Sequence, residues 1–335
     1  MLNKQVTIKD LARKLGVSVS TVSRALRNVQ DINPETRRQV LALAKELNYE
    51  PNFIAKSLVN KHTKVIGVIL PVIASSYFAN ALSGMMEIAD ANGYHIMFCQ
   101  SDESVEKEVI SIKKLVSIRI DGLLVSVSKN TADADEFARV QQKGIPVVFF
   151  DRALDHIEAT KVTVNQYQGA FAAVEHLIER GCTRIAHLAG PRSLSIAMDR
   201  LKGYLDALAK HNLPIRQEYI LHCEDFQRGA LEKVETLFEL EEKPNGIFAV
   251  NDSSAIICIK YLQEKGYRVP EDVAIAGYNN DPVSEVVAPS LTTVMQPSYE
   301  VGKLATQLLI DEIENKSNSF HREVLSGELI IRSSS

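Results

Sequence analysis

The sequence predicts an all-α N-terminal domain followed by an α/β core of two doubly wound subdomains. Two observations support this fold class. Apolar residues recur at helical spacing in three short stretches within residues 7–48, which predicts three small helices. From Lys64 onward, short apolar runs alternate with longer amphipathic stretches, and this alternation is typical of parallel sheets covered by helices. A chain of 335 residues is also long enough for two or three domains.

The first two helices are predicted to form a helix-turn-helix. The stretch from Thr7 to Arg27 reads TIKDLARKLGVSVSTVSRALR. Thr7 can cap the first helix together with Asp10. Gly16 can adopt the positive φ that ends this helix, and Ser18 can cap the next one. Two helices joined by so short a turn are typical of a helix-turn-helix.

The second helix is predicted to turn a DNA-binding face outward. Its outward residues are Val19, Ser20, Ser23 and Arg24, and small hydroxyls with one guanidinium suit the major groove. Residues 1–60 hold ten Lys and Arg against five Asp and Glu, a net charge of +5, whereas the rest of the chain holds 28 against 37, a net charge of −9. A basic first domain on an acidic body indicates nucleic-acid binding at one end.

A third helix and an unusual linker follow. The helix is predicted from Pro34 to about Asn48, with proline at its first position. The linker Asn52–Asn60 reads NFIAKSLVN, which is too apolar for a plain tether. The residues of this linker predict a short amphipathic helix. This helix either packs on its own domain or has another function.

The run GVSVSTVSRAL, followed by Asn33-Pro34-Glu35-Thr36, resembles the lactose/galactose repressor (LacI/GalR) family of bacterial transcription factors. The resemblance implies a homodimeric repressor that binds a palindromic operator in double-stranded DNA. It also implies that the linker is a hinge helix that enters the minor groove, where Leu58 can wedge between bases. The DNA-binding residues expected are Thr7, Ser18, Val19, Ser20, Thr21, Ser23 and Arg24 in the helix-turn-helix, and Ala55, Lys56 and Leu58 in the hinge.

The core pattern predicts two sets of strands and helices. Strand candidates are Val65–Pro71, His95–Gln100, Gly122–Ser126, Pro146–Asp151, Val162–Val164, Arg184–Ala189, Tyr219–Cys223, Gly246–Asn251 and Val273–Tyr278. Two later apolar runs, Leu291–Pro297 and Leu325–Arg332, come after the second set. In the family, the chain crosses three times between the halves of a periplasmic-binding-protein-like body with a cleft between them.

The expected divisions are a headpiece at residues 1–50, a hinge at residues 51–61 and an effector-binding core at residues 62–335. Within the core, the resemblance implies an N-subdomain of about residues 62–163 and 294–323. The C-subdomain is then about residues 164–293 and 324–335.

Polar and aromatic residues follow several of the predicted strands, where ligands bind in doubly wound sheets. Amides, carboxylates, guanidinium groups and aromatic rings together suit polyols and sugars. Each Asp or Asn taken alone is as well explained as a helix cap or a turn residue. The positions that match the effector pocket of the family are Tyr77, Phe78, Asp151, Arg200, Phe226, Asn251, Asp252 and Asn279. The expected partner is therefore a small effector, a sugar or sugar derivative.

Two departures from the family pattern bear on the effector. Position 279 is often Asp in the family and is Asn279 here, so an acceptor becomes a mixed donor and acceptor. Leu194 and Ile196 stand where the purine-responsive member has polar ligand contacts. This substitution counts against a purine effector.

The sequence disfavours two other function classes, a solute-binding protein and an enzyme. A solute-binding protein of a sugar transporter would share the body, but the N-terminus MLNKQVTIKD lacks the apolar stretch of a signal peptide. No apolar run approaches the roughly 20 residues of a membrane span, so a cytoplasmic protein is expected. An enzyme is disfavoured because the sequence lacks a G-x-G-x-x-G after a strand, a Walker A motif, a G-x-S-x-G motif and a metal-ligand cluster. No catalytic residue, metal or cofactor is predicted.

Overall fold

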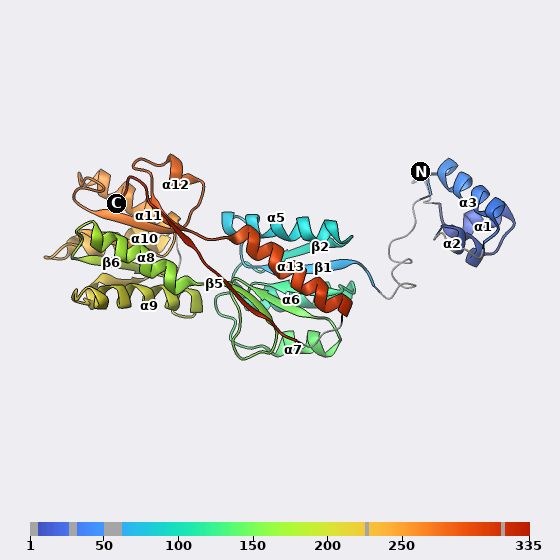
Figure 1. The fold of residues 1–335 in the computed structure, drawn as a ribbon, viewed down its shortest axis with the longest axis horizontal. Coiled ribbons are helices and arrows are strands. Elements are labelled where there is room, and N and C mark those ends of the chain that lie inside the picture. The colour runs from blue at the N-terminus through green and yellow to red at the C-terminus, as the bar shows by residue number, and fades with distance from the viewer. Residues whose placement is uncertain (1–5, 27–31, 50–61, 225–227, 316–318) are drawn as a thin grey trace. The chain divides into compact units, whose positions relative to one another are not determined.

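The computed structural model describes residues 6–26, 32–49, 62–224, 228–315 and 319–335. The chain divides into two compact units, Met1–Thr63 and Lys64–Ser335. Figure 1 shows the helical first unit in blue and the α/β second unit in the remaining colours.

The first unit contains the three predicted helices, α1 (Ile8–Leu15), α2 (Val19–Leu26) and α3 (Pro34–Glu46). The start of α3 is capped by Asn33, whose side chain accepts a hydrogen bond from the Glu35 backbone N–H at 2.8 Å. Its end comes two residues before the predicted Asn48. The buried side chains of this small core are Leu11, Ala12, Val22, Ala25, Val40 and Ala44.

The second unit holds two six-stranded sheets. In the first, every neighbouring pair is parallel, and the order is β11 (Arg322–Leu325), β5 (Thr160–Val164), β4 (Val147–Phe150), β3 (Gly122–Val125), β1 (Val65–Leu70) and β2 (His95–Gln100). Helices α5 (Ser76–Ala91) and α13 (Ser298–Asn315) pack on one face, and α6 (Val105–Ser117) and α7 (Asp135–Gln142) pack on the other.

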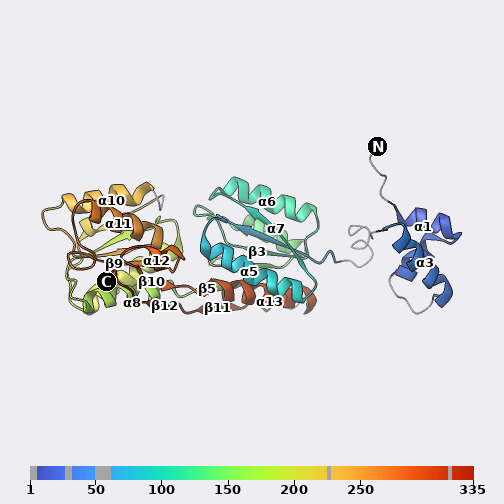
Figure 2. The same ribbon diagram turned by 90° about the horizontal axis from the view of Figure 1, so that it is seen from above.

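Two glycines let α5 and α13 approach closely, and Figures 1 and 2 show these helices side by side. A Cβ at Gly84 would collide with the backbone carbonyl of Tyr299, and one at Gly302 would collide with that of Ala81. The backbones therefore meet without intervening side chains.

The order in the second sheet is β12 (Glu328–Ile330), β10 (Thr292–Met295), β9 (Ala274–Asn279), β8 (Gly246–Ala249), β6 (Ile185–Ala189) and β7 (Ile220–His222). In this sheet, only β12 is antiparallel to its neighbour. One face is covered by α8 (Gln166–Glu179) and α9 (Ser195–Lys210). The other is covered by α10 (Arg228–Glu239) and α11 (Asp252–Glu264). A short helix, α12 (Val283–Val286), follows β9, and a 3-10 helix, η1 (Gln217–Tyr219), precedes β7.

The chain crosses between the two halves after β5, after β10 and after β11. The predicted run Leu325–Arg332 is therefore not one strand, because Leu325 ends β11 in the first sheet and β12 lies in the second. Gly327 lies in this last crossing, where a Cβ would come within 2.9 Å of the Met295 carbonyl oxygen. Every other strand predicted in the core is present, within two residues at each end.

Among the described residues, no helix combines the length and apolar character needed to cross a membrane.

Candidate DNA-binding face and ligand cavity

The turn between α1 and α2 is built by the residues that the sequence singles out. The Asp10 carboxylate accepts hydrogen bonds from the Thr7 backbone N–H at 3.0 Å and from the Thr7 hydroxyl at 2.6 Å. Gly16 ends α1 with a φ of 65°, a conformation that favours glycine. Ser18 Oγ then accepts a hydrogen bond from the Thr21 backbone N–H at 3.0 Å, which caps α2.

One face of α2 is exposed and polar. Val22 and Ala25 are buried in the headpiece core, whereas Val19 is 40% exposed and Arg24 also lies in solvent. At the helix start, the hydroxyl of Ser18 lies 2.7 Å from that of Ser20 and 2.8 Å from that of Thr21. Ser23, which precedes Arg24 in the sequence, is partly exposed. The face thus offers hydroxyls and a guanidinium, which suit base edges and phosphates.

Four of the predicted site residues lie outside the described residues. These are Ala55, Lys56 and Leu58 in the expected hinge, and Phe226 in the expected effector pocket.

The second unit contains a cavity of about 850 Å³ to which both halves contribute. It lies at the carboxyl ends of the parallel strands, where doubly wound sheets bind ligands. Six of the predicted effector residues line it: Tyr77, Phe78, Asp151, Arg200, Asn251 and Asn279. The fold therefore brings together residues that are more than 200 positions apart in the chain.

Arg200, from α9, is buried and is held mainly by neutral groups. Its Nε and Nη2 donate to Gln166 Oε1 at 3.0 and 2.8 Å, and its Nη1 donates to the Val250 carbonyl at 2.5 Å. Its guanidinium lies 3.7 Å from the ring centroid of Tyr278, a cation–π contact. Burial lowers the pKa of Arg200, but a guanidinium stays charged. These contacts orient the side chain without neutralising it.

A hydrogen-bond chain runs on from Arg200 along one wall of the cavity. Gln166, which also receives the Arg200 bonds, donates from Nε2 to Gln296 Oε1 at 2.9 Å. Gln296 then donates from Nε2 to Asn279 Oδ1 at 2.7 Å. Gln166 and Gln296 stand next to two of the chain crossings, after β5 and β10 respectively. Gln296 and Asn279 line the cavity, whereas Gln166 does not. In this chain, each amide N–H group is paired with the oxygen of the next amide.

Asp151 and Tyr77 also line the cavity. Asp151 follows β4 with a φ of 59°, and non-glycine residues in this left-handed region concentrate at functional sites. Its Oδ2 accepts a long bond of 3.3 Å from Ser126 Oγ. Burial raises the pKa of Asp151, while Arg152 and Arg200 act in the opposite direction. Burial and then the Asp151 charge raise the pKa of Tyr77, whose hydroxyl has no hydrogen-bond partner among the described residues.

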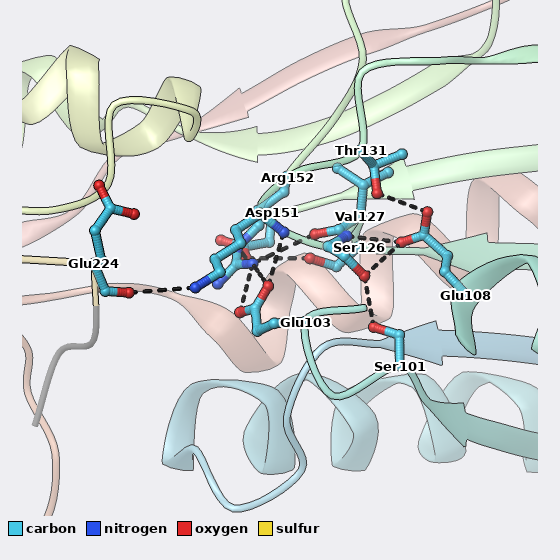
Figure 3. Close-up of polar contacts among 11 residues, drawn as sticks. Ser101, Glu103, Glu108, Ser126, Val127, Thr131, Asp151, Arg152 and Glu224 are labelled. Atoms are coloured by element: carbon cyan, nitrogen blue, oxygen red, sulfur yellow. Dashed lines mark hydrogen bonds and ion pairs between the residues drawn. The ribbon is translucent and has the colours of Figure 1, made fainter. Parts of the chain in front are cut away.

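Next to Asp151, a buried ion pair joins two loops, as Figure 3 shows. Arg152 Nη1 lies 2.9 Å from both carboxylate oxygens of Glu103. The Glu103 carboxylate also accepts a hydrogen bond from the Lys129 backbone N–H at 2.8 Å, while Lys129 Nζ donates to the Glu224 carbonyl at 3.4 Å. Charge-assisted bonds of this kind fix the geometry of a site.

A second buried carboxylate, Glu108 of α6, supports the same loops (Figure 3). It accepts hydrogen bonds from the Ser128 backbone N–H at 2.7 Å and from the Thr131 hydroxyl at 2.8 Å. Burial raises the pKa of Glu108 despite these bonds. Glu108 is not among the residues that line the cavity, so it acts as a support for the loop that carries Lys129.

Taken alone, each predicted Asp or Asn could be a structural residue and not a ligand contact. Two residues at the start of α11, Asn251 and Asp252, do have structural contacts. Asn251 caps the helix by accepting a hydrogen bond from Ser254 N at 2.9 Å, and it also lines the cavity. Asp252 does not line the cavity. Its buried carboxylate accepts hydrogen bonds from Asp281 N, Ser284 Oγ and Thr293 Oγ1, at 2.7, 2.9 and 2.5 Å. We therefore assign Asp252 a structural role behind the cavity wall.

Several lining residues are not among the eight predicted effector residues: Ser76, Glu103, Lys129, Arg152, Glu224, Asp281 and Gln296. Ile196, which the sequence comparison with the family placed at a ligand contact, also lines the cavity. Arg152 and Glu103 had a signal, because each follows a predicted strand by one to three residues. Gln296 had none, since it lies on a crossing that strand periodicity does not reveal. Among the described residues, no group of three or more His, Cys, Asp and Glu side chains could hold a metal ion.

A helix-turn-helix unit and a two-sheet core with a polar cavity define a ligand-responsive DNA-binding regulator rather than an enzyme. Residues 7–52 match the model of the bacterial regulatory proteins of the lacI family, and residues 174–335 match that of the periplasmic binding protein-like domain. The chain is 33% identical to the ribose operon repressor of Halalkalibacterium halodurans, over 97% of this chain and 96% of that protein. It is 32% identical to the HTH-type transcriptional repressor PurR of Vibrio atlanticus, over 98% of each chain.

Solved structures agree over nearly the whole length. The lac repressor dimer bound to operator and the anti-inducer ONPF superposes with a TM-score of 0.87 at 25% identity, covering 99% of each chain. The complex of the transcriptional regulator CelR with cellobiose superposes with a TM-score of 0.76 at 25% identity, covering 99% of this chain and 100% of that one. The protein belongs to the lacI family of bacterial regulatory proteins.

Proposed function

We propose that this protein is a homodimeric repressor of carbohydrate-utilisation genes, whose affinity for a palindromic operator changes when a small sugar occupies the cavity. The observation that supports this proposal most is the composition of the cavity wall. Arg200, Asp151, Asn251 and Asn279 supply charged and amide groups, and Phe78 supplies an apolar ring face. Planar donor and acceptor groups beside an aromatic face suit the hydroxyls and the apolar side of a sugar ring.

Relatives of both ligand classes exist, so the cavity must distinguish a sugar from a purine. The names of the ribose operon repressor and of the CelR–cellobiose complex point to sugars, whereas the name of the PurR repressor gives no sugar. Ile196 lines the cavity and Leu194 is buried, so neither supplies a polar contact to a base. The predominance of amides and charges over stacking rings favours the sugar.

The route from ligand to DNA is expected to pass through residues 51–61. A helix this short is unstable alone, so it gains order when two copies meet on the operator. Ala55, Lys56 and Leu58 are proposed to enter the minor groove there. By thermodynamic reciprocity, an inducer must bind the DNA-free form more tightly, and a corepressor the DNA-bound form.

The headpiece also separates this proposal from a solute-binding protein of a sugar transporter. Such a protein would need the cavity but no DNA-binding face. The capped helix-turn-helix with Arg24 on its exposed side favours a nucleic-acid partner.

The test begins with thermal unfolding of the full chain against ribose, xylulose, cellobiose, lactose, hypoxanthine and guanine. A ligand at a hundredfold its dissociation constant stabilises the folded state by about 2.7 kcal/mol, so a binder is visible as a rise in Tm. The operator is then selected from a random double-stranded pool, and its affinity is measured with and without the binder. We expect at least one sugar to raise Tm and to change operator affinity in the linked direction.

Two results would contradict the proposal. If a purine raises Tm and changes operator affinity, and no sugar has either effect, the effector is a purine and not a sugar. If the selection from the random pool enriches no palindrome, the proposal that the protein is a dimeric repressor is wrong.

A further inference from the structure

The buried charges on the cavity wall balance only because of one residue from a loop. Two cations, Arg152 and Arg200, are 7% and 5% exposed, and one carboxylate, Asp151, is 6% exposed. These three groups alone carry one excess positive charge. Glu103 supplies the missing negative charge, because its side chain is only 22% exposed and its carboxylate pairs with Arg152 at 2.9 Å.

The ion pair with Glu103 removes the excess positive charge of the wall. It leaves a hydrogen-bond donor of Arg152, and one of a neighbouring residue, without an acceptor. Arg152 Nε lies 3.8 Å from Asp151 Oδ2, which is too far for a hydrogen bond, and it has no other partner among the described residues. The Tyr77 hydroxyl is likewise buried and without a hydrogen-bond partner there. A buried polar atom without a partner is costly, so both groups are suited to a ligand oxygen.

Glu103 is held in place by its own backbone and by its neighbours. Both Asp102 and Glu103 adopt positive φ values, 52° and 58°, which non-glycine residues rarely do. Asp102 is tied down by an ion pair with Lys107 at 2.5 Å. On the facing loop, the Lys129 backbone N–H donates to Glu103. The carboxylate is thus fixed toward Arg152, as Figure 3 shows.

The remaining charges of the cavity lie on other side chains and have their own contacts. Lys129 Nζ donates to the Glu224 backbone carbonyl, and the Asp281 carboxylate accepts a hydrogen bond from Ser76. Glu224 is exposed. This part of the lining holds one ammonium group, of Lys129, and two carboxylates, of Glu224 and Asp281, so it does not favour an anion either.

We propose that Glu103 is a specificity-determining residue, which makes the cavity select neutral sugars over sugars that carry a phosphate or carboxylate group. A hydroxyl or ring oxygen accepts hydrogen bonds from Arg152 and Tyr77 without any change in charge. An anionic group at the same place adds a negative charge to a wall where Glu103 and Asp151 already balance Arg152 and Arg200, and such like-charge repulsion is an efficient source of specificity. The inference rests on the proposed function, because it narrows the class of sugar bound by the same cavity.

The first experiment removes the charge of Glu103 and uses inorganic phosphate as the probe. Glu103→Gln keeps an acceptor oxygen for Arg152 and Lys129 but leaves Arg152 uncompensated. At constant ionic strength, phosphate should bind this variant about tenfold or more tightly than it binds the wild-type protein, as judged from the rise in Tm with phosphate concentration. The double variant Glu103→Gln/Arg152→Gln should lose the gain, because the cation is gone.

The control is Glu106→Gln, which removes an exposed carboxylate three residues away. It should respond to phosphate as the wild-type protein does. An equal phosphate response in the wild-type protein, Glu103→Gln and the double variant would overturn the proposal. If Glu103→Gln does not fold, Glu103→Ser provides the same test with a smaller uncharged side chain.

The second experiment needs no variant. Ribose is compared with ribose 5-phosphate, and glucose with glucose 6-phosphate, by their effect on the Tm of the wild-type protein. We expect any response to come from the neutral member of each pair, and a phosphorylated sugar that binds as tightly as its neutral partner would overturn the proposal. If phosphate distinguishes Glu103→Gln from the wild-type protein while no sugar affects operator binding, the charge role of Glu103 stands and the sugar effector fails.

Discussion

The cavity contains two buried arginines whose surroundings differ in one respect, the charge of the hydrogen-bond acceptor. Arg200 donates to the amide of Gln166 and to the Val250 carbonyl, whereas Arg152 donates to the carboxylate of Glu103. A neutral acceptor orients a guanidinium but leaves its charge available, while a carboxylate both orients and neutralises it. Arg200 is therefore the group that we expect to bind the ligand most strongly. Arg152 is expected to set which ligands are admitted.

The largest expected effect comes from removing Arg200, the arginine whose hydrogen-bond acceptors are all neutral. Arg200→Ala should weaken the ligand found by thermal unfolding by about 2–5 kcal/mol, because the ligand loses a buried charged partner. At the ligand concentration that raises the Tm of the wild-type protein, the variant should show no rise. Titration calorimetry with the same ligand measures the loss directly.

The matched control for Arg200 is Arg180→Ala, which removes an exposed arginine of the same half. It should leave the ligand response intact. A ligand response in Arg200→Ala equal to that of the wild-type protein would remove Arg200 from the binding site and would end the contrast between the two arginines.

A smaller effect is expected from removing the neutral acceptor. Gln166→Leu deprives the buried guanidinium of its shared oxygen, and it also leaves Gln296 without its donor. The free energy of unfolding should fall by about 1–3 kcal/mol, the cost of unsatisfied buried polar groups. Urea unfolding measures this change, with the exposed Gln168→Leu as the control. Equal values for the two variants would show that Gln166 does not hold Arg200 in solution.

Arg200 could be predicted from the sequence, but its partner could not. Arg200 lies within α9 and not at the end of a strand, and its prediction comes from the match to the effector pocket of the family. Gln166 and Gln296 are 130 residues apart and meet only because the chain crosses between the halves at both places. Periodicity shows where strands begin and end, and it contains no information on such crossings.

Asp252 shows the opposite difficulty. It follows a strand like Asn251, so the sequence gives both the same expectation, yet only Asn251 lines the cavity. The Asp252 side chain turns toward the sheet, where Gly277 leaves space for its carboxylate. Whether a residue at a helix start faces a ligand or the protein depends on such space, which is set by residues far away in the chain.

A third arginine, Arg24 on the exposed face of α2, extends the comparison to the headpiece. Because Arg24 is exposed, we expect its main contribution to be to DNA binding. Arg24→Ala should reduce the discrimination at one operator base pair by about 1–3 kcal/mol. Operator variants with single base changes, measured by fluorescence anisotropy, give this value.

The control for Arg24 is Arg38→Ala, another exposed arginine, on α3. It should change the affinities for all operator variants by a similar factor or not at all. A uniform loss over all sequences in Arg24→Ala would show that this side chain contacts phosphate only.

The smallest expected effect concerns Asp151, the carboxylate that faces both cavity arginines. Burial raises its pKa above the ordinary value of 3.8, although Arg152 and Arg200 oppose this shift. A carboxyl group that binds its proton more tightly in the folded state contributes stability that is fully present below pH 3.8. This contribution is lost as the pH rises through the raised pKa. Asp151→Asn cannot ionise, so it should avoid the loss.

The difference in unfolding free energy between Asp151→Asn and the wild-type protein should therefore grow in favour of the variant as the pH rises from 3.8. Its slope is at most about 1.4 kcal/mol per pH unit for a single proton. Urea unfolding from about pH 4 to about pH 7 measures the slope, and Asp90→Asn, an exposed carboxylate, is the control. Parallel profiles for the wild-type protein and Asp151→Asn would mean that the two arginines compensate the burial of Asp151 completely. In that case Asp151 would act as a charge partner of Arg200 as Glu103 does of Arg152, and the contrast between the two arginines would disappear.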